Sequence, residues 1–251
     1  RLYDRIDTAA LFARAVAAVQ ALQPAAQAVV LTGDLVDRGS AAEYAHLREL
    51  LSPLACPVWL MPGNHDDAAA MRRAFPDHPE LAPPDDPALS GQVLWVREVA
   101  GLRVVALDTV VPKAPHGALC PARLTWLDRA LAAAPHQPTL VAMHHPPFVT
   151  GIAHMDAMGL CEGADALAAV LMRHPQVERV ICGHLHRPIV RRFGGTVAMT
   201  VPSTGHQIVL DLREGGPPSW CREPPGFAVH LLRDGALVSH LATPGTRDRV
   251  A

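Results

Sequence analysis

The sequence is poor in charged residues and has no long apolar run. Only 18% of its 251 residues are charged, and the formal net charge of -2 gives the chain no general attraction for polyanions. No stretch of about twenty consecutive apolar residues occurs, so the printed sequence has no transmembrane helix, and Arg1–Asp4 does not have the pattern of a signal peptide. These absences favour a small substrate over a nucleic-acid polymer or a membrane.

Cysteine is also scarce, and its spacing excludes two kinds of site. The five cysteines are odd in number and scattered, without a C-x-x-C pair, so we expect neither a zinc knuckle nor a dithiol redox motif. We expect reduced thiols in a cytoplasmic protein. Histidine, in contrast, occurs fourteen times, and several histidines stand beside Asp, Asn or Gly in short motifs. The chemistry of the chain should be sought in those motifs.

Hydrophobic residues make up 49% of the chain, which is typical of a globular protein, and we expect one domain over residues 1–251. Short apolar runs alternate with segments of helical periodicity, which indicates an α/β fold whose sheet is covered on both faces. Helices are predicted over residues 8–22, 41–51, 121–133 and 164–172, and strands over residues 28–31, 58–61, 103–107, 139–143 and 179–182.

The pattern changes after Gly195 to strands without helices between them. We therefore expect residues 196–251 to be a β-rich part that completes a second sheet. The Gly- and Pro-rich segment 213–226 is predicted to be a surface loop. The strands of this part are predicted over residues 196–201, 207–212, 227–232 and 236–241.

Four polar motifs follow predicted strands, each at the point where the strand ends. They are GDLVDRG (Gly33–Gly39), GNHD (Gly63–Asp66), HHPP (His144–Pro147) and GHLH (Gly183–His186). Loops at the carboxyl ends of strands converge in α/β folds, so the motifs should bring Asp, Asn and His to one place. Each motif alone is weak, because Gly-Asp turns are common and an isolated histidine is more often structural. Their joint occurrence indicates a functional site.

Together the motifs resemble the signature of the calcineurin-like metallophosphoesterase superfamily. The similarity is to the branch of class III cyclic-nucleotide phosphodiesterases and bacterial glycerophosphodiesterases, and it continues through LYDRID (Leu2–Asp7), HMD (His154–Asp156) and PSTGHQ (Pro202–Gln207). GDLVDRG alone would also suit Ser/Thr protein phosphatases, but HHPP and the compact length favour the phosphodiesterases. The resemblance implies a two-sheet sandwich flanked by helices, and hydrolysis of small phosphodiesters by a hydroxide that bridges two metal ions.

The resemblance also implies a set of metal ligands. Asp34 would bridge both metals, because the two oxygens of a carboxylate can each face one cation. Asn64, His144 and His184 would bind the second metal, and His186 would bind the first. This nitrogen and oxygen set suits Mn, Fe, Co or Zn, and the absence of thiolate argues against a structural zinc cluster.

Further residues are expected around the metals. By resemblance, His65 points at the substrate, where it could donate a proton to the departing alkoxide, and His206 lies near the same pocket. Asn64 would also contact the substrate. His145 should point away from the metals into a supporting hydrogen bond. Asp37 and Asp66 are interpreted as turn and helix-start residues that orient the motifs.

Two alternative functions stay open. A broad phosphomonoesterase would use the same metals, and parallel assays on bis(p-nitrophenyl) phosphate and p-nitrophenyl phosphate would separate it from a diesterase. A non-catalytic scaffold of this fold, like the retromer subunit, is the other alternative. Partners other than a small phosphodiester are not expected, apart from a possible homo-oligomer formed through the β-rich part.

One family motif is missing from the printed sequence, and it generates a prediction. The family's first strand ends in Asp-x-His, which supplies two ligands to the first metal, but no Asp-x-His precedes Arg5. On the printed residues the first metal keeps only Asp34 and His186 and would bind weakly or not at all. We expect Asp-x-His within about thirty residues upstream of Arg1, enough for one strand and a short loop. Reading the upstream coding sequence tests this prediction. An upstream sequence without the Asp-x-His motif would favour the non-catalytic scaffold.

Overall fold

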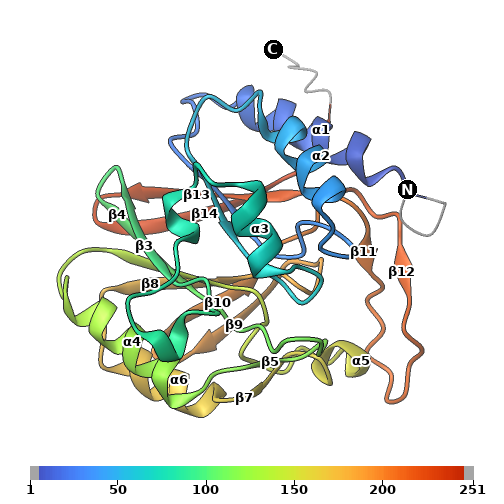
Figure 1. Ribbon diagram of the computed structural model, residues 1–251. Coiled ribbons are helices and arrows are strands. Elements are labelled where there is room, and N and C mark those ends of the chain that lie inside the picture. The colour runs from blue at the N-terminus through green and yellow to red at the C-terminus, as the bar shows by residue number, and fades with distance from the viewer. Residues whose placement is uncertain (1–5, 246–251) are drawn as a thin grey trace.

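A six-stranded mixed sheet forms the centre of the computed structural model, which describes residues 6–245 (Figure 1). Residues 1–5, which include most of LYDRID, and residues 246–251 lie outside the described part. The four inner strands are parallel to their inner neighbours, and the two edge strands are antiparallel. In spatial order the strands are β3 (Trp95–Val99), β4 (Leu102–Leu107), β6 (Thr139–Met143), β8 (Val177–Cys182), β10 (Thr196–Thr200) and β9 (Ile189–Phe193).

A second, smaller parallel sheet is formed by β1 (Val29–Thr32) and β2 (Val58–Met61). Helices α1 (Thr8–Gln20), α2 (Ala41–Leu51) and α3 (Ala68–Ala74) lie on its side of the molecule (Figure 1). Each of these helices begins at a side-chain cap, and the cap of α2 is a full capping box between Ser40 and Glu43. The caps fix where the loops after β1 and β2 turn into helices.

The large sheet separates two apolar cores because its strands alternate. In β4, Val104 and Ala106 face the small sheet with its helices, whereas Val105 and Leu107 face the opposite side. There they pack against α4 (Pro121–Ala132) and α6 (Ala164–Met172). Both faces of the large sheet are therefore covered, as the apolar strand runs predicted.

The remaining elements are short or lie near the end of the chain. Parallel strands β5 (Gly117–Ala118) and β7 (Leu160–Glu162) flank a single-turn helix, α5 (Ala153–Asp156), and two 3₁₀ turns cover Pro79–Leu81 and Pro87–Leu89. Two antiparallel pairs follow: β11 (Gln207–Ile208) with β12 (Trp220–Cys221), and β13 (Phe227–Arg233) with β14 (Ala236–Ala242). Among the described residues, no helix is long and apolar enough to cross a membrane.

The predicted α/β sandwich with a β-rich end is confirmed. Helices α2 and α6 and strands β2 and β6 have the predicted bounds. The strand predicted over residues 207–212 is wrong beyond Ile208, because the Asp211 amide donates to the Val209 carbonyl (2.9 Å) and bends the chain away from β12. The loop predicted over 213–226 in turn contains β12. Sequence reasoning missed α3, whose seven residues are too few to show a period, and the edge strands β3 and β9, which carry charged residues.

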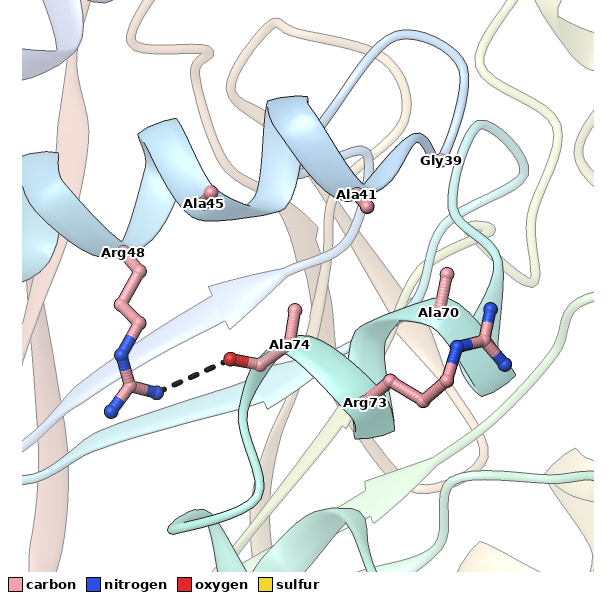
Figure 2. Close-up of a pocket in the computed structure, with 7 residues that line it drawn as sticks. All are labelled: Gly39, Ala41, Ala45, Arg48, Ala70, Arg73 and Ala74. Atoms are coloured by element: carbon pink, nitrogen blue, oxygen red, sulfur yellow. Dashed lines mark hydrogen bonds between the residues drawn. The ribbon is translucent and has the colours of Figure 1, made fainter.

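Helices α2 and α3 leave a shallow hollow of about 290 Å³ between them. Its floor consists of alanines from both helices, and Arg48 closes one end by donating to the Ala74 carbonyl, 3.3 Å away (Figure 2). None of the predicted metal or substrate residues lines this hollow. The polar motifs lie instead at the ends of β1, β2, β6 and β8.

Candidate metal centre

The carboxyl ends of four strands meet where the two sheets face each other. Thr32, the last residue of β1, accepts a hydrogen bond through its carbonyl from Nδ1 of His144, which follows β6 in the other sheet (2.7 Å). Gly183, directly after β8, is so close that a Cβ there would lie 2.5 Å from the same carbonyl oxygen. The convergence expected from the motif positions is therefore present.

Asp34, Asn64 and His144 form the middle of the cluster. Nε2 of His144 lies 3.3 Å from Oδ2 of Asp34 and 3.2 Å from Oδ1 of Asn64. Oδ1 of Asp34 accepts the backbone amide of His65 at 3.0 Å. One imidazole nitrogen and two side-chain oxygens thus converge from three different strand ends.

Glycine is required where the turns approach. A Cβ on Gly63 would lie 2.3 Å from both the amide nitrogen and Oδ1 of Asp34, and a Cβ on Gly33 would lie 2.5 Å from Nδ1 of His144. Gly33 also has a φ of +90°, which other residues rarely adopt. The glycines that open GDLVDRG and GNHD therefore allow the contact between the two turns.

Three of the expected ligands have left-handed backbone conformations. The φ angles are 54° at Asp34, 66° at His184 and 56° at His186, and only three other non-glycine residues of the described chain have positive φ. Such conformations are costly and cluster at functional sites. Here they occur where the chain must turn sharply as it leaves a strand.

Leu185 holds the GHLH turn between its two histidines. Its side chain is fully buried in a small apolar cluster with Ile152 and Met155 from the segment around α5. Its amide donates to the Gly183 carbonyl at 2.7 Å. Because Leu185 is anchored in this cluster, His184 and His186 are held on either side of it in fixed positions.

Two buried imidazole nitrogens indicate that the site can hold a metal ion. Nε2 of His184 and Nδ1 of His186 are buried and have no hydrogen-bond partner among the described residues. Buried polar atoms are nearly always satisfied, so two such nitrogens beside a carboxylate and an amide oxygen suit an electropositive ligand. The donor set is imidazole and oxygen, which fits a divalent transition metal.

The electrostatics of the site keep these two rings neutral. Burial, followed by the nearby His144, lowers the pKa of His184 to about 3, and burial together with His206 lowers the pKa of His186 to about 4. Burial opposes ionisation of Asp34 and His144 as well. Their mutual attraction outweighs it, so the pKa of Asp34 is lowered and that of His144 is raised. Neutral imidazole and ionised carboxylate are the forms that bind metals, so a cation at His144 would have to replace a proton on its Nε2.

His145 lies in the same group of rings but has its own partners. Ring nitrogens of His144, His145 and His184 come within 4.8 Å of one another. Both nitrogens of His145 are nevertheless engaged, because Nδ1 lies 2.8 Å from the Thr109 hydroxyl and Nε2 lies 3.2 Å from the Pro115 carbonyl. Burial lowers the pKa of His145 to about 2, so the ring is neutral and can satisfy both bonds. The structure thus places His145 in a supporting position, as predicted.

His65 and His206 differ in exposure. The His65 side chain is 48% exposed, and its Nδ1 lies 2.9 Å from the Asp37 carbonyl, which orients the ring at the open side of the site. His206 is buried, with its ring centre 4.5 Å from that of His186 and 5.9 Å from that of Trp220. His206 therefore packs against the ring of His186, and its contact with substrate stays a prediction.

Asp66 lies in the turn before α3, whereas the residue that caps α3 is Asp67. Sequence reasoning thus placed the helix start one residue early. It also missed Thr32, Thr109 and Leu185, which hold the histidines in place. A carbonyl partner such as that of Thr32 leaves no signal in the sequence, because any residue could supply it.

The comparisons with known proteins agree with this geometry. Residues 7–188 match the model of the family described as calcineurin-like phosphoesterase. The chain is 36% identical over 243 residues to the probable cyclic nucleotide phosphodiesterase RPA0124 of Rhodopseudomonas palustris. This match covers 96% of this chain and 85% of that protein. The chain is also 32% identical over 231 residues to the glycerophosphodiester phosphodiesterase GpdQ of Enterobacter lignolyticus. That match covers 92% of this chain and 81% of the relative.

Solved structures show the same fold at lower identity. Purple acid phosphatase PPD1 from yellow lupin (Lupinus luteus) superposes with a TM-score of 0.68 at 15% identity, covering 94% of this chain and 47% of that chain. This likeness shows the fold alone, whereas the family match and the two relatives confirm the resemblance drawn from the four motifs. With a family match over residues 7–188 and relatives above 30% identity across at least 92% of its length, the chain belongs to the calcineurin-like phosphoesterase family.

Proposed function

We propose that the protein is a metal-dependent phosphodiesterase that hydrolyses small diesters of the cyclic-nucleotide or glycerophosphodiester type. The observation that carries the proposal is the pair of buried nitrogens on His184 and His186 near Asp34, which have no hydrogen-bond partner within residues 6–245. The relatives at 32% and 36% identity, which bear the names of glycerophosphodiester and cyclic nucleotide phosphodiesterases, support the choice of diesters.

Two divalent cations are proposed as cofactors, with Mn, Fe, Co and Zn as the candidates. Asp34 would contact both cations, Asn64, His144 and His184 would hold the second, and His186 would face the first. Such a pair lowers the pKa of a water molecule towards neutrality and offsets the charge that grows on the phosphoryl oxygens.

The chain's own residues orient these ligands. The Thr32 carbonyl fixes the His144 ring so that Nε2 faces Asp34 and Asn64. The Asp37 carbonyl holds Nδ1 of His65, so the opposite nitrogen of this half-exposed ring is available to a substrate. In its protonated form that nitrogen can donate a proton to the departing alkoxide.

Removing the metals should abolish activity, and the bridging ligand should matter most. We expect hydrolysis of bis(p-nitrophenyl) phosphate to vanish after dialysis against a chelator and to return with Mn, Co, Fe or Zn. Asp34→Asn should be more damaging than Asn64→Ala, because it weakens both metals at once. Metal content by elemental analysis should fall together with the rate.

Asp77→Asn is the matched control for these variants. It removes an exposed carboxylate that pairs with Arg48 away from the site, so it should leave activity unchanged. Undiminished turnover by protein shown to be metal-free would contradict the proposed mechanism. A clear preference of the wild type for p-nitrophenyl phosphate over the diester would instead identify a phosphomonoesterase.

His65→Ala should separate substrates by their leaving groups. If the ring protonates the alkoxide, the variant should lose about 10² to 10⁴ in rate on esters of glycerol or ribose, and much less on p-nitrophenyl esters, which need no acid. Bound metal should stay at the wild-type level. Equal losses on both kinds of ester would assign His65 to phosphate binding, and a loss of metal would place it among the ligands.

A further inference from the structure

We propose that Asp66 and Tyr44 act together as positioning residues that set the separation of Asp34 and Asn64, and hence the affinity of the site for metal. The inference rests on the proposed function, because it assigns metals to those two side chains. Neither Asp66 nor Tyr44 is a ligand in that assignment.

The carboxylate of Asp66 ties the two ligand-bearing turns together. Its Oδ2 accepts the Leu35 amide at 3.0 Å and the Gly63 amide at 2.9 Å. Leu35 follows Asp34 directly, and Gly63 directly precedes Asn64. This one oxygen atom therefore fixes the backbone directly after Asp34 and directly before Asn64.

Tyr44 anchors this carboxylate to helix α2. Its hydroxyl donates to Oδ1 of Asp66 at 3.0 Å and accepts the Asp67 amide at 3.0 Å, while its ring is fully buried in the core beside Phe75. The hydroxyl thus donates its proton to Asp66 and accepts a proton from the next residue, Asp67. The Asp66 oxygens are held from the helix as well as from both loops.

An amide at position 66 could not make the same bonds. Asn has one accepting oxygen and one NH₂ group, so if the oxygen kept the two amides, the NH₂ group would face the Tyr44 hydroxyl. That hydroxyl would then keep only its longer contact, 3.4 Å to the Asp67 carbonyl, as an acceptor for its proton. The shorter bond from Tyr44 therefore favours a carboxylate over an amide at position 66, although the carboxylate of Asp34 lies nearby.

The turns leave little room to adjust if this tie is cut. A Cβ at Gly63 would lie 2.3 Å from the Asp34 amide, so the two turns already touch. A shift of either turn moves Asp34 relative to Asn64, and the loss of groups that orient metal ligands typically costs 10- to 100-fold in metal affinity.

The test is the affinity of the full chain for Mn²⁺, measured by isothermal titration calorimetry after the metal has been removed. We expect Tyr44→Phe and Asp66→Asn each to raise the Kd by about 10- to 100-fold. The effects in the double variant should be less than additive on the free-energy scale, because both substitutions break one network. Tyr44→Phe keeps the core filled, so it gives a result even if Asp66→Asn folds poorly.

Gln176→Leu is the matched control. It removes one buried side-chain hydrogen bond, the 3.0 Å bond from Nε2 to the Leu131 carbonyl, in the other core of the protein. We expect it to lower the melting temperature as Tyr44→Phe does while leaving the Kd for Mn²⁺ unchanged. Equal Kd values for Tyr44→Phe, Gln176→Leu and wild type would reduce Tyr44 and Asp66 to a structural role and overturn the inference.

The outcome also distinguishes this inference from the proposed function. A wild type that binds Mn²⁺ but hydrolyses no diester would contradict the proposed function, while the change in Kd would still support the positioning role. A wild type that binds no divalent metal would overturn both.

Discussion

The hydrogen bond from Nδ1 of His144 to the Thr32 carbonyl joins the two sheets of the protein at the place where their strands end. The bond is possible because Gly33, Gly63 and Gly183 have no side chains in the space that His144 and the Asp34 turn occupy. It fixes the opposite nitrogen of His144 beside Asp34 and Asn64, which come from the other sheet. The caps of α2 and α3 and the anchored side chain of Leu185 then set the directions of the loops around this contact.

Burial has two consequences at this junction. It lowers the pKa values of His184 and His186, so both rings are neutral near pH 7, and it leaves one nitrogen of each without a partner in the described part of the chain. The second consequence costs free energy in the metal-free protein, because a buried polar group is unfavourable unless it is bonded. A divalent cation would satisfy both nitrogens together with Asp34. The buried, unbonded nitrogens therefore destabilise the protein without metal, and the same nitrogens are well placed to bind a cation.

Much of the site could be predicted from the sequence because its residues follow apolar strands directly. Asp34, Asn64, His144 and His184 each stand at such an end, and α/β folds bring these ends together. The supporting contacts could not be predicted, because they join distant residues without a pattern. The bond between His144 and Thr32 spans 112 positions, and Tyr44 has the apolar spacing of an ordinary core residue on α2. The short helix α3 could not be predicted, and the strand that ends at Ile208 was predicted too long. Local hydrogen bonds, and not the periodicity of the sequence, decide where these two elements end.

Anomalous diffraction at the manganese edge, from crystals of the protein grown with Mn²⁺, would show where metal binds. We expect an anomalous peak within coordination distance of Asp34, Asn64, His144 and His184, with His145 outside the coordination sphere. A further peak, if the first site fills, should lie between Asp34 and His186. A peak coordinated by His145, or no peak beside Asp34 at saturating Mn²⁺, would show that the metal ligands are wrongly assigned.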